Sequence, residues 1–231
     1  MHAPSPQTIP PEMLLLAYRS GIFPMADTRD DPDIFWVEPR ERAIIPLDGF
    51  HCARTLRKVL RQDRFTVTCD TAFTEVIDAC AAPRDDHPES WISERIAASY
   101  SALHRAGHAH SIECWQDGEL AGGLYGVSFE RAFCGESMFS RANDASKVAL
   151  AWLIAMMRQA GFMLLDCQFM TGHLSTLGAV TMPQADYLTL LSEACEQPSS
   201  SSLPDAYRAL IAQAGDHSPG KLIAQSFTQT S

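Results

Sequence analysis

A run of four apolar residues that ends on an acid, Phe162-Met163-Leu164-Leu165-Asp166, limits most strongly what this chain can fold into. Such an uninterrupted run is typical of a β-strand that is buried on both faces of its sheet. The segment before it, residues 145–160, has the apolar face and the length of a helix, and Gly161 predicts its end. The sequence therefore predicts a sheet covered on both faces, in which a long helix leads into a central strand.

Three further strands are expected before this helix, over residues 110–115, 120–127 and 132–139. The first two are joined by Gln116-Asp117-Gly118-Glu119, a hairpin turn of the Asp-Gly type. Three antiparallel strands, a helix, a buried strand and another helix follow the order of a GNAT-type core. We therefore predict an α+β protein with a GNAT-like (acyl-CoA N-acyltransferase-like) domain, a fold analogy that does not identify the acyl donor.

The expected domain organisation places a small α/β domain before this core. We predict an N-terminal domain over residues 1–62, the GNAT-like catalytic domain over 63–197 and a partly mobile C-terminal extension over 198–231. Residues 21–25 are expected to form an apolar loop, and a polar tail is expected after residue 214. The remaining predicted elements are strands over 35–37, 43–45 and 65–69, and helices over 11–18, 51–64, 71–82, 91–106, 171–177, 183–196 and 205–214.

Composition excludes several classes of protein. The chain has 231 residues, of which 46% are hydrophobic, so it is not a wholly disordered chain. The longest strongly apolar run, Val148–Met157, is too short to span a bilayer, and the N-terminus lacks the pattern of a signal peptide. The net charge of -10 argues against sequence-blind coating of nucleic acid. We expect a soluble cytoplasmic protein that has no contact with membranes.

The cysteines and histidines do not form a recognisable metal or disulfide pattern. The seven cysteines contain no C-x-x-C pair, and their odd number argues against a complete disulfide framework. His104, His108 and His110 lie on either side of a helix end and a strand start, which would scatter their side chains. We therefore expect reduced cysteines, structural histidines and no metal site.

Seven short stretches closely resemble the leucyl/phenylalanyl-tRNA–protein transferase family over roughly residues 11–191. They are Gly21–Met25 (GIFPM), Trp36–Arg40 (WVEPR), Gly107–Glu113 (GHAHSIE), Gly122–Val127 (GGLYGV), Phe133–Ser140 (FCGESMFS), Ala145–Lys147 (ASK) and Leu165–Gln168 (LDCQ). The resemblance implies transfer of Leu or Phe, with Met as a further candidate, from aminoacyl-tRNA to proteins that begin with Arg or Lys. It further implies a step of the N-degron pathway. We expect a monomer that acts without a cofactor or metal.

The residues themselves argue against a coenzyme A donor. A GNAT that uses acetyl-CoA carries glycines before its long helix, so that backbone N–H groups can approach the pyrophosphate. The corresponding segment here, residues 140–147, has no glycine. A small-molecule N-acetyltransferase therefore stays as the alternative enzyme, and a non-catalytic tRNA-binding or adaptor module as the alternative of another class.

The resemblance also implies where the donor binds. It assigns the donor's side chain and terminal adenosine to aromatic and apolar residues matching Trp36, Trp91, Leu124 and Phe133, to which we add Ser137 and Met138. A deep apolar pocket accepts Leu and Phe and rejects β-branched residues by shape, at about 1–3 kcal/mol per misfitted methylene. We expect Leu124 and Phe133 to line this pocket, and the two tryptophans to stack on the adenine. The alternative is that these aromatic and apolar residues only pack in the core.

The catalytic candidates are Glu136, Asp166 and Gln168. Asp166 ends the buried strand, and Gln168 points to the same side if the strand continues, so that Cys167 points away and is not expected to be a nucleophile. The resemblance implies that Gln168 contacts the attacking α-amino group with Asp166 behind it. A neutral amide has almost no basicity, so we expect both residues to position the amine rather than to deprotonate it. The alternative is a structural hydrogen-bond network.

For tRNA, the local candidates are basic residues of one predicted helix face together with a loop arginine: Arg54, Arg57, Lys58, Arg61 and Arg84. A solvated helix face is the alternative. The acidity of the chain, with Glu136 and Asp166, suits an acceptor whose first side chain is cationic.

Overall fold

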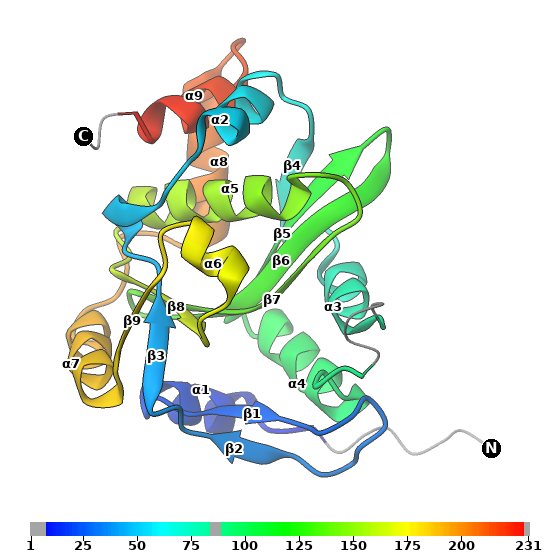
Figure 1. Cartoon of the computed structure of the whole chain (residues 1–231), viewed down its shortest axis with the longest axis vertical. Coiled ribbons are helices and arrows are strands. Elements are labelled where there is room, and N and C mark those ends of the chain that lie inside the picture. Colours follow the sequence, from blue (N-terminus) through cyan, green and yellow to red (C-terminus); the bar gives the residue numbers. More distant parts are fainter. Residues whose placement is uncertain (1–7, 84–88, 229–231) are drawn as a thin grey trace.

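The computed structural model describes residues 8–83 and 89–228, and a seven-stranded mixed sheet forms their centre (Figure 1). The strand order is β4-β5-β6-β7-β8-β3-β9, and only the β7–β8 pair among these described strands is parallel. The strands are β3 (Glu41–Ile44), β4 (Thr66–Cys69), β5 (Ala109–Gln116), β6 (Glu119–Phe129), β7 (Ala132–Ser140), β8 (Leu164–Gln168) and β9 (Val180–Pro183). The protein is therefore a mixed α+β protein.

Helices cover both faces of the sheet, as the uninterrupted apolar run before Asp166 predicts. One core lies under α5 (Ala145–Gln159), α2 (Arg54–Arg61), α8 (Leu203–Ala214) and α9 (Pro219–Ser226). The core of the opposite face lies under α1 (Pro11–Arg19), α3 (Phe73–Ala81), α4 (Glu94–Arg105) and α7 (Gln184–Cys195). The short α6 (Gly172–Thr176) follows β8, and a 3-10 turn, η1 (Leu47–Gly49), follows β3. No helix among the described residues has the length and apolarity needed to cross a membrane.

The N-terminal segment contributes to two sheets. β1 (Phe23–Met25) and β2 (Phe35–Val37) form a separate antiparallel pair, whereas β3 inserts into the main sheet between β8 and β9. β3 thus comes from the segment predicted as the N-terminal domain and lies in the sheet of the predicted catalytic domain. The division at residue 62 stays a prediction.

Three elements differ from the sequence predictions. The predicted loop over residues 21–25 contains β1, and β9 also escapes prediction; each of these strands contains a proline, Pro24 or Pro183, which argues against a strand in the sequence. The predicted polar tail contains α9, whose residues Ile223 and Ala224 are buried. Ser218 caps this helix and Pro219 begins it, so a start signal was present in the sequence.

Candidate active site

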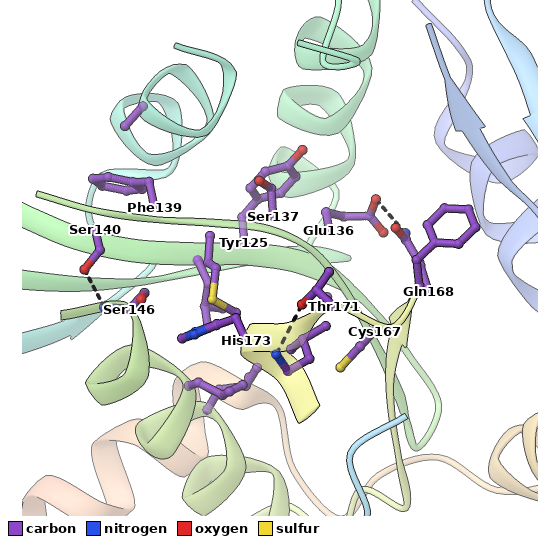
Figure 2. A pocket seen from close by; sticks show the side chains of 18 of the residues that line it. Tyr125, Glu136, Ser137, Phe139, Ser140, Ser146, Cys167, Gln168, Thr171 and His173 are labelled. Atoms are coloured by element: carbon purple, nitrogen blue, oxygen red, sulfur yellow. Dashed lines mark hydrogen bonds between the residues drawn. The ribbon is translucent and has the colours of Figure 1, made fainter. Parts of the chain in front are cut away.

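The parallel strands β7 and β8 separate after a short ladder, and a pocket opens between them. Their pairing runs only from Ala132–Leu164 to Cys134–Asp166, although β7 continues to Ser140. Residues that follow the last pair on each strand line a pocket of about 690 Å³ (Figure 2). This volume lies within the range of about 300–1,000 Å³ that is typical of small-molecule sites.

The pocket has walls from both faces of the sheet, because it lies where the strands part. The first wall is apolar and belongs to the core under α5; we call it the α5-side wall, and it comprises Leu124, Met138, Leu150, Leu153, Leu165, Cys167 and Leu174. The second wall belongs to the opposite core; we call it the α3-side wall, and it comprises Met25, Ala79, Trp91, Tyr125 and Phe139. A ligand with two chemically different parts can therefore occupy both sides of the sheet at once.

Glu136 lies at the junction of the two walls because of a β-bulge. Tyr125 of β6 pairs with Ser137 of β7, whereas the next residue, Gly126, pairs with Gly135, so Glu136 is the extra residue. A bulge of this kind redirects a side chain and is common beside active sites. At Gly126 a Cβ atom would lie 2.3 Å from the carbonyl oxygen of Cys134, so the bulge requires glycine opposite it.

The carboxylate of Glu136 accepts three hydrogen bonds. Its Oε1 accepts one from the Tyr18 hydroxyl at 2.7 Å. Its Oε2 accepts one from the Tyr100 hydroxyl at 3.0 Å and one from Nε2 of Gln168 at 3.0 Å. Burial raises the pKa of Glu136 to about 7, although the three hydrogen bonds lower it by favouring the ionised form. Glu136 therefore changes its charge near neutral pH.

The two tyrosines are donors held on separate helices. Tyr18 lies on α1 and Tyr100 on α4, and their hydroxyl groups also contact each other. Burial, and then the charge of Glu136, raises the pKa of both phenols. Both hydroxyls therefore keep their protons and fix the position of the carboxylate.

Gln168 ends β8 in a strained turn. Its φ angle is 61°, which is uncommon for a residue other than glycine, and the N–H of Phe169 donates to the carbonyl oxygen of Cys167 at 2.7 Å. The side chain points toward Glu136 (Figure 2) and donates from Nε2. Within the described residues its amide oxygen accepts no hydrogen bond. Since Gln168 lines the pocket, this oxygen is available to accept a hydrogen bond from a bound amine.

Asp166 is fully buried behind Gln168 in an ion pair with Arg42. Nε and Nη2 of Arg42 donate to the two carboxylate oxygens at 2.9 and 2.5 Å, and both side chains are 0% exposed. The carboxylate also accepts hydrogen bonds from the Tyr187 hydroxyl at 3.0 Å and from the backbone N–H of Gln168 at 2.8 Å. Asp166 therefore holds the backbone of Gln168 rather than its side chain.

Arg42 makes further contacts with a backbone carbonyl and two aromatic rings. Its Nη1 donates to the carbonyl oxygen of Gly21 at 3.0 Å, and its guanidinium lies 4.9 Å from the ring centroid of Phe23 and 4.4 Å from that of Tyr187. Burial lowers the pKa of Arg42, but the charge and hydrogen bonds of Asp166 outweigh this and raise it overall. The buried ion pair between Arg42 and Asp166 therefore fixes the position of the turn at Gln168.

The structure brings most of the predicted site residues together. Those that line the pocket are Trp91, Leu124, Glu136, Ser137, Met138 and Gln168, with Asp166 directly behind. Phe133 is fully buried in the core and is not among the described lining residues. Trp36, on β2, is 39% exposed and does not line the pocket either; Met25 of the neighbouring β1 does.

The predicted tRNA-binding residues lie apart from the pocket. Arg54, Arg57, Lys58 and Arg61 belong to α2, where all except the half-buried Arg57 are exposed. No described residue of α2 lines the pocket. Arg84 lies outside the described residues.

Sequence reasoning missed Tyr18, Arg42, Tyr100 and Tyr187. Tyr18 lies on the apolar face of a predicted helix and Arg42 directly before a predicted strand, patterns shared by ordinary structural residues. Met25 had a signal, because it ends the GIFPM stretch.

The surroundings of Cys167, His104 and His110 favour structural roles for these side chains. Burial raises the pKa of Cys167, which disfavours the nucleophilic thiolate. His104 and His110 bond through Nδ1 to the Ala109 carbonyl and the Asp70 carboxylate, each at 2.7 Å. Within residues 8–83 and 89–228, no group of three or more His, Cys, Asp and Glu side chains is arranged to hold a metal ion.

Comparison with solved structures gives only a weak likeness. The structure of L-PGS from Bacillus licheniformis matches with a TM-score of 0.37 and 14% identity, over 71% of this chain and 55% of that chain. The C-terminal domain of a putative lysylphosphatidylglycerol synthetase from Agrobacterium fabrum matches with the same TM-score and 12% identity, over 90% of this chain and 71% of that chain. At such scores the likeness carries no argument about fold or function.

Comparison at the level of sequence is decisive. The family model for leucyl/phenylalanyl-tRNA protein transferase matches residues 44–192, and the model for the N-terminal domain of that family matches residues 7–40. A leucyl/phenylalanyl-tRNA–protein transferase of Novosphingobium aromaticivorans is 57% identical, over 98% of both chains. One of Zymomonas mobilis is 55% identical over 80% of this chain and 69% of its own length. This chain therefore belongs to the leucyl/phenylalanyl-tRNA–protein transferase family.

Proposed function

We propose that this protein transfers Leu or Phe, with Met as a further candidate, from aminoacyl-tRNA to the α-amino group of proteins that begin with Arg or Lys. The observation that carries this proposal is the pocket between β7 and β8, where an apolar wall meets the Glu136–Gln168 pair. The apolar α5-side wall suits an unbranched or aromatic side chain, and the free amide oxygen of Gln168 suits an incoming amine. The product would enter the N-degron pathway.

In this proposal the chain's residues act by orientation. The α-amino group, whose pKa is about 7.7–8.0, is partly neutral at pH 7 and needs no strong base. Gln168 accepts a hydrogen bond from the amine, while Glu136 and Asp166 fix its side chain and its backbone. Orientation of this kind can contribute about 7–11 kcal/mol to lowering the barrier.

The proposed step balances without a cofactor. The amine nitrogen forms a bond with the ester carbonyl carbon, and the bond from that carbon to the ribose oxygen breaks. The leaving ribose oxygen receives a proton, and the amine loses one through the ribose hydroxyl of the donor or a water molecule. The ester is already activated, so the exchange needs no further energy source.

Several finer features belong to the same proposal. The three antiparallel strands β5–β7, the crossing helix α5 and the parallel β8 support a GNAT-like fold for the catalytic part. The exposed basic residues of α2 suit the backbone of the tRNA acceptor stem. Glu136 suits a cationic acceptor because it is the one carboxylate among the described lining residues. We place the protein in the cytoplasm as a monomer.

The test is a transfer assay with matched acceptors. Purified protein is incubated with Phe-tRNA and three peptides that differ only in a first residue of Arg, Lys or Glu. Mass measurement should show one added phenylalanyl residue on the Arg and Lys peptides and none on the Glu peptide. Equal reaction of all three would contradict the acceptor assignment. Transfer from acetyl-CoA but not from Phe-tRNA would support the alternative N-acetyltransferase.

A further inference from the structure

The opposite end of the pocket carries polar side chains that the proposed reaction does not use. Ser140 and Arg141 lie at the end of β7, Ser146 lies in the first turn of α5 and His173 belongs to α6; all four line the pocket, and we call them the polar end. Figure 2 shows Ser140 and Ser146 at one end of the pocket and Glu136 and Gln168 at the other. The pocket therefore joins two polar regions through an apolar middle.

Ser146 gives the first indication of a ligand. The residue is only 7% exposed, and within the described part of the chain its hydroxyl has no hydrogen-bond partner. Only its backbone N–H is engaged, with the hydroxyl oxygen of Ser140 at 3.3 Å. Since Ser146 lines the pocket, its hydroxyl is available to donate a hydrogen bond to a ligand atom.

The start of α5 adds a favourable field for an anion. The helix has 15 residues, and the side chain of Asp144, which precedes it, makes no capping hydrogen bond. The first N–H groups of a helix carry a partial positive charge and commonly bind phosphate. The unpartnered hydroxyl of Ser146 lies within this first turn, so both features favour the same kind of ligand.

The polar end has a net positive charge, because Arg141 is charged whereas the charges of Lys147 and Asp144 offset each other. Arg141 uses one nitrogen to donate to the Leu120 carbonyl oxygen at 3.1 Å and lies over the Phe139 ring, which leaves its other N–H groups available. Lys147 pairs with Asp144 at 3.2 Å and lies near His173, whose pKa is lowered by burial and by the charge of Lys147. The single carboxylate among the described lining residues, Glu136, is at the other end. In a protein of net charge -10, this local balance favours an anion.

We propose that the polar end binds the 5′-phosphate of the donor's 3′-terminal nucleotide, an inference that rests on the proposed function. This phosphate is the anion nearest to the reacting ester, since six bonds of about 1.5 Å separate it from the ester carbonyl carbon. Along β7, Glu136 and Ser140 are four residues apart, or about 13 Å at 3.3 Å per residue. Six bonds of about 1.5 Å reach at most about 9 Å, so the side chains at the two ends must bridge the remaining distance of about 4 Å.

The test compares two unreactive probes that differ only in the phosphate. One is adenosine that carries phenylalanine through a 3′-amide, and the other is its 5′-monophosphate. The wild-type protein should bind the phosphorylated probe about 10-fold more tightly, as expected for new hydrogen bonds to a charged group. Arg141→Gln and Ser146→Ala should each reduce this advantage while leaving the affinity for the phosphate-free probe unchanged. Lys221→Gln, which removes an exposed charge on α9, is the matched control and should change neither affinity.

The outcomes separate this proposal from the proposed function. If both probes bind the wild-type protein equally well, the phosphate site is wrong and the donor pocket stands. If Arg141→Gln and Ser146→Ala weaken both probes equally, their role is structural and the phosphate site is again wrong. If neither probe binds, the donor pocket fails, and the phosphate site fails with it.

Discussion

Asp166→Asn should lower the free energy of unfolding by about 3–5 kcal/mol, the usual cost of removing one partner from a buried ion pair. The reason is that the guanidinium of Arg42, which is 0% exposed, loses its counter-charge and one of the two oxygens that accept its hydrogen bonds. At about 2–4 °C per kcal/mol, this corresponds to a fall in Tm of roughly 6–20 °C. Thermal and urea unfolding of the purified variant measure the effect.

Two companion variants show whether the lost energy comes from the unpaired charge. Arg42→Met/Asp166→Asn removes both charges and should recover much of the stability, because a pair replaced by uncharged groups leaves no buried charge behind. Tyr187→Phe removes one hydrogen bond to Asp166 and should cost only about 1 kcal/mol. If the double variant were as unstable as Asp166→Asn alone, the ion pair would not be the source of the effect.

In the folded fraction of Asp166→Asn, we expect the turnover rate to fall more than the affinity for the donor. The reason is that the substitution weakens the hydrogen bond from the backbone N–H of Gln168 to the side chain at position 166.

Glu136→Gln should reduce turnover by about 100-fold, the order of loss caused by misplacing a reacting group by 1 Å. The carboxylate accepts three hydrogen bonds, and an amide in its place presents N–H donors to other donors. Gln168 then loses the partner that fixes its amide. Single-turnover transfer, measured beside donor affinity, should show the loss in rate with little change in affinity.

The same variant should change how stability depends on pH. Burial raises the pKa of Glu136 to about 7 in the folded protein, above its unfolded value of about 4.3. The fold therefore favours the protonated form, and the Glu136 contribution to stability falls as pH rises from about 4.3 to 7 and is constant above. Glu136→Gln should lack this fall. Tyr18→Phe removes a hydrogen bond that lowers the pKa of Glu136, so it should shift the pH transition in stability to higher pH. Tyr207→Phe is the control and should not shift this transition, because the hydroxyl of Tyr207 donates to the Val67 carbonyl oxygen and not to Glu136. An unchanged pH dependence in Glu136→Gln would assign the titration to another group.

The central architecture follows from patterns that are strong in the sequence. The apolar run before Asp166, the helix over residues 145–160 and the Asp-Gly turn between two strands each correspond to an element of the structure. Burial on both faces leaves no polar alternation, and a long helix repeats its apolar face several times, so these signals are redundant. β1 and β9 each contain a proline, which argues against a strand, and the pairing of β9 with β3 depends on a distant partner.

Three of the predicted site residues follow from local order along the strands. Asp166 and Gln168 end β8, and Glu136 lies on the neighbouring strand, so local order places them near one another. The positions of Tyr18, Arg42 and Tyr100 come from α1, β3 and α4, and no spacing along the chain indicates that these three elements meet. The bulge at Glu136 likewise depends on the register between β6 and β7. Motif resemblance finds the residues that line the pocket more readily than those that hold them.

A crystal structure with the unreactive phenylalanyl-adenosine amide tests the central claim most directly. The phenyl ring should contact the α5-side wall at Leu124, Met138 and Leu150, and the amide linkage should lie beside the side chain of Gln168. The account would be contradicted by a ring seated on the α3-side wall or outside the pocket, or by an amide linkage beyond hydrogen-bond reach of both Gln168 and Glu136.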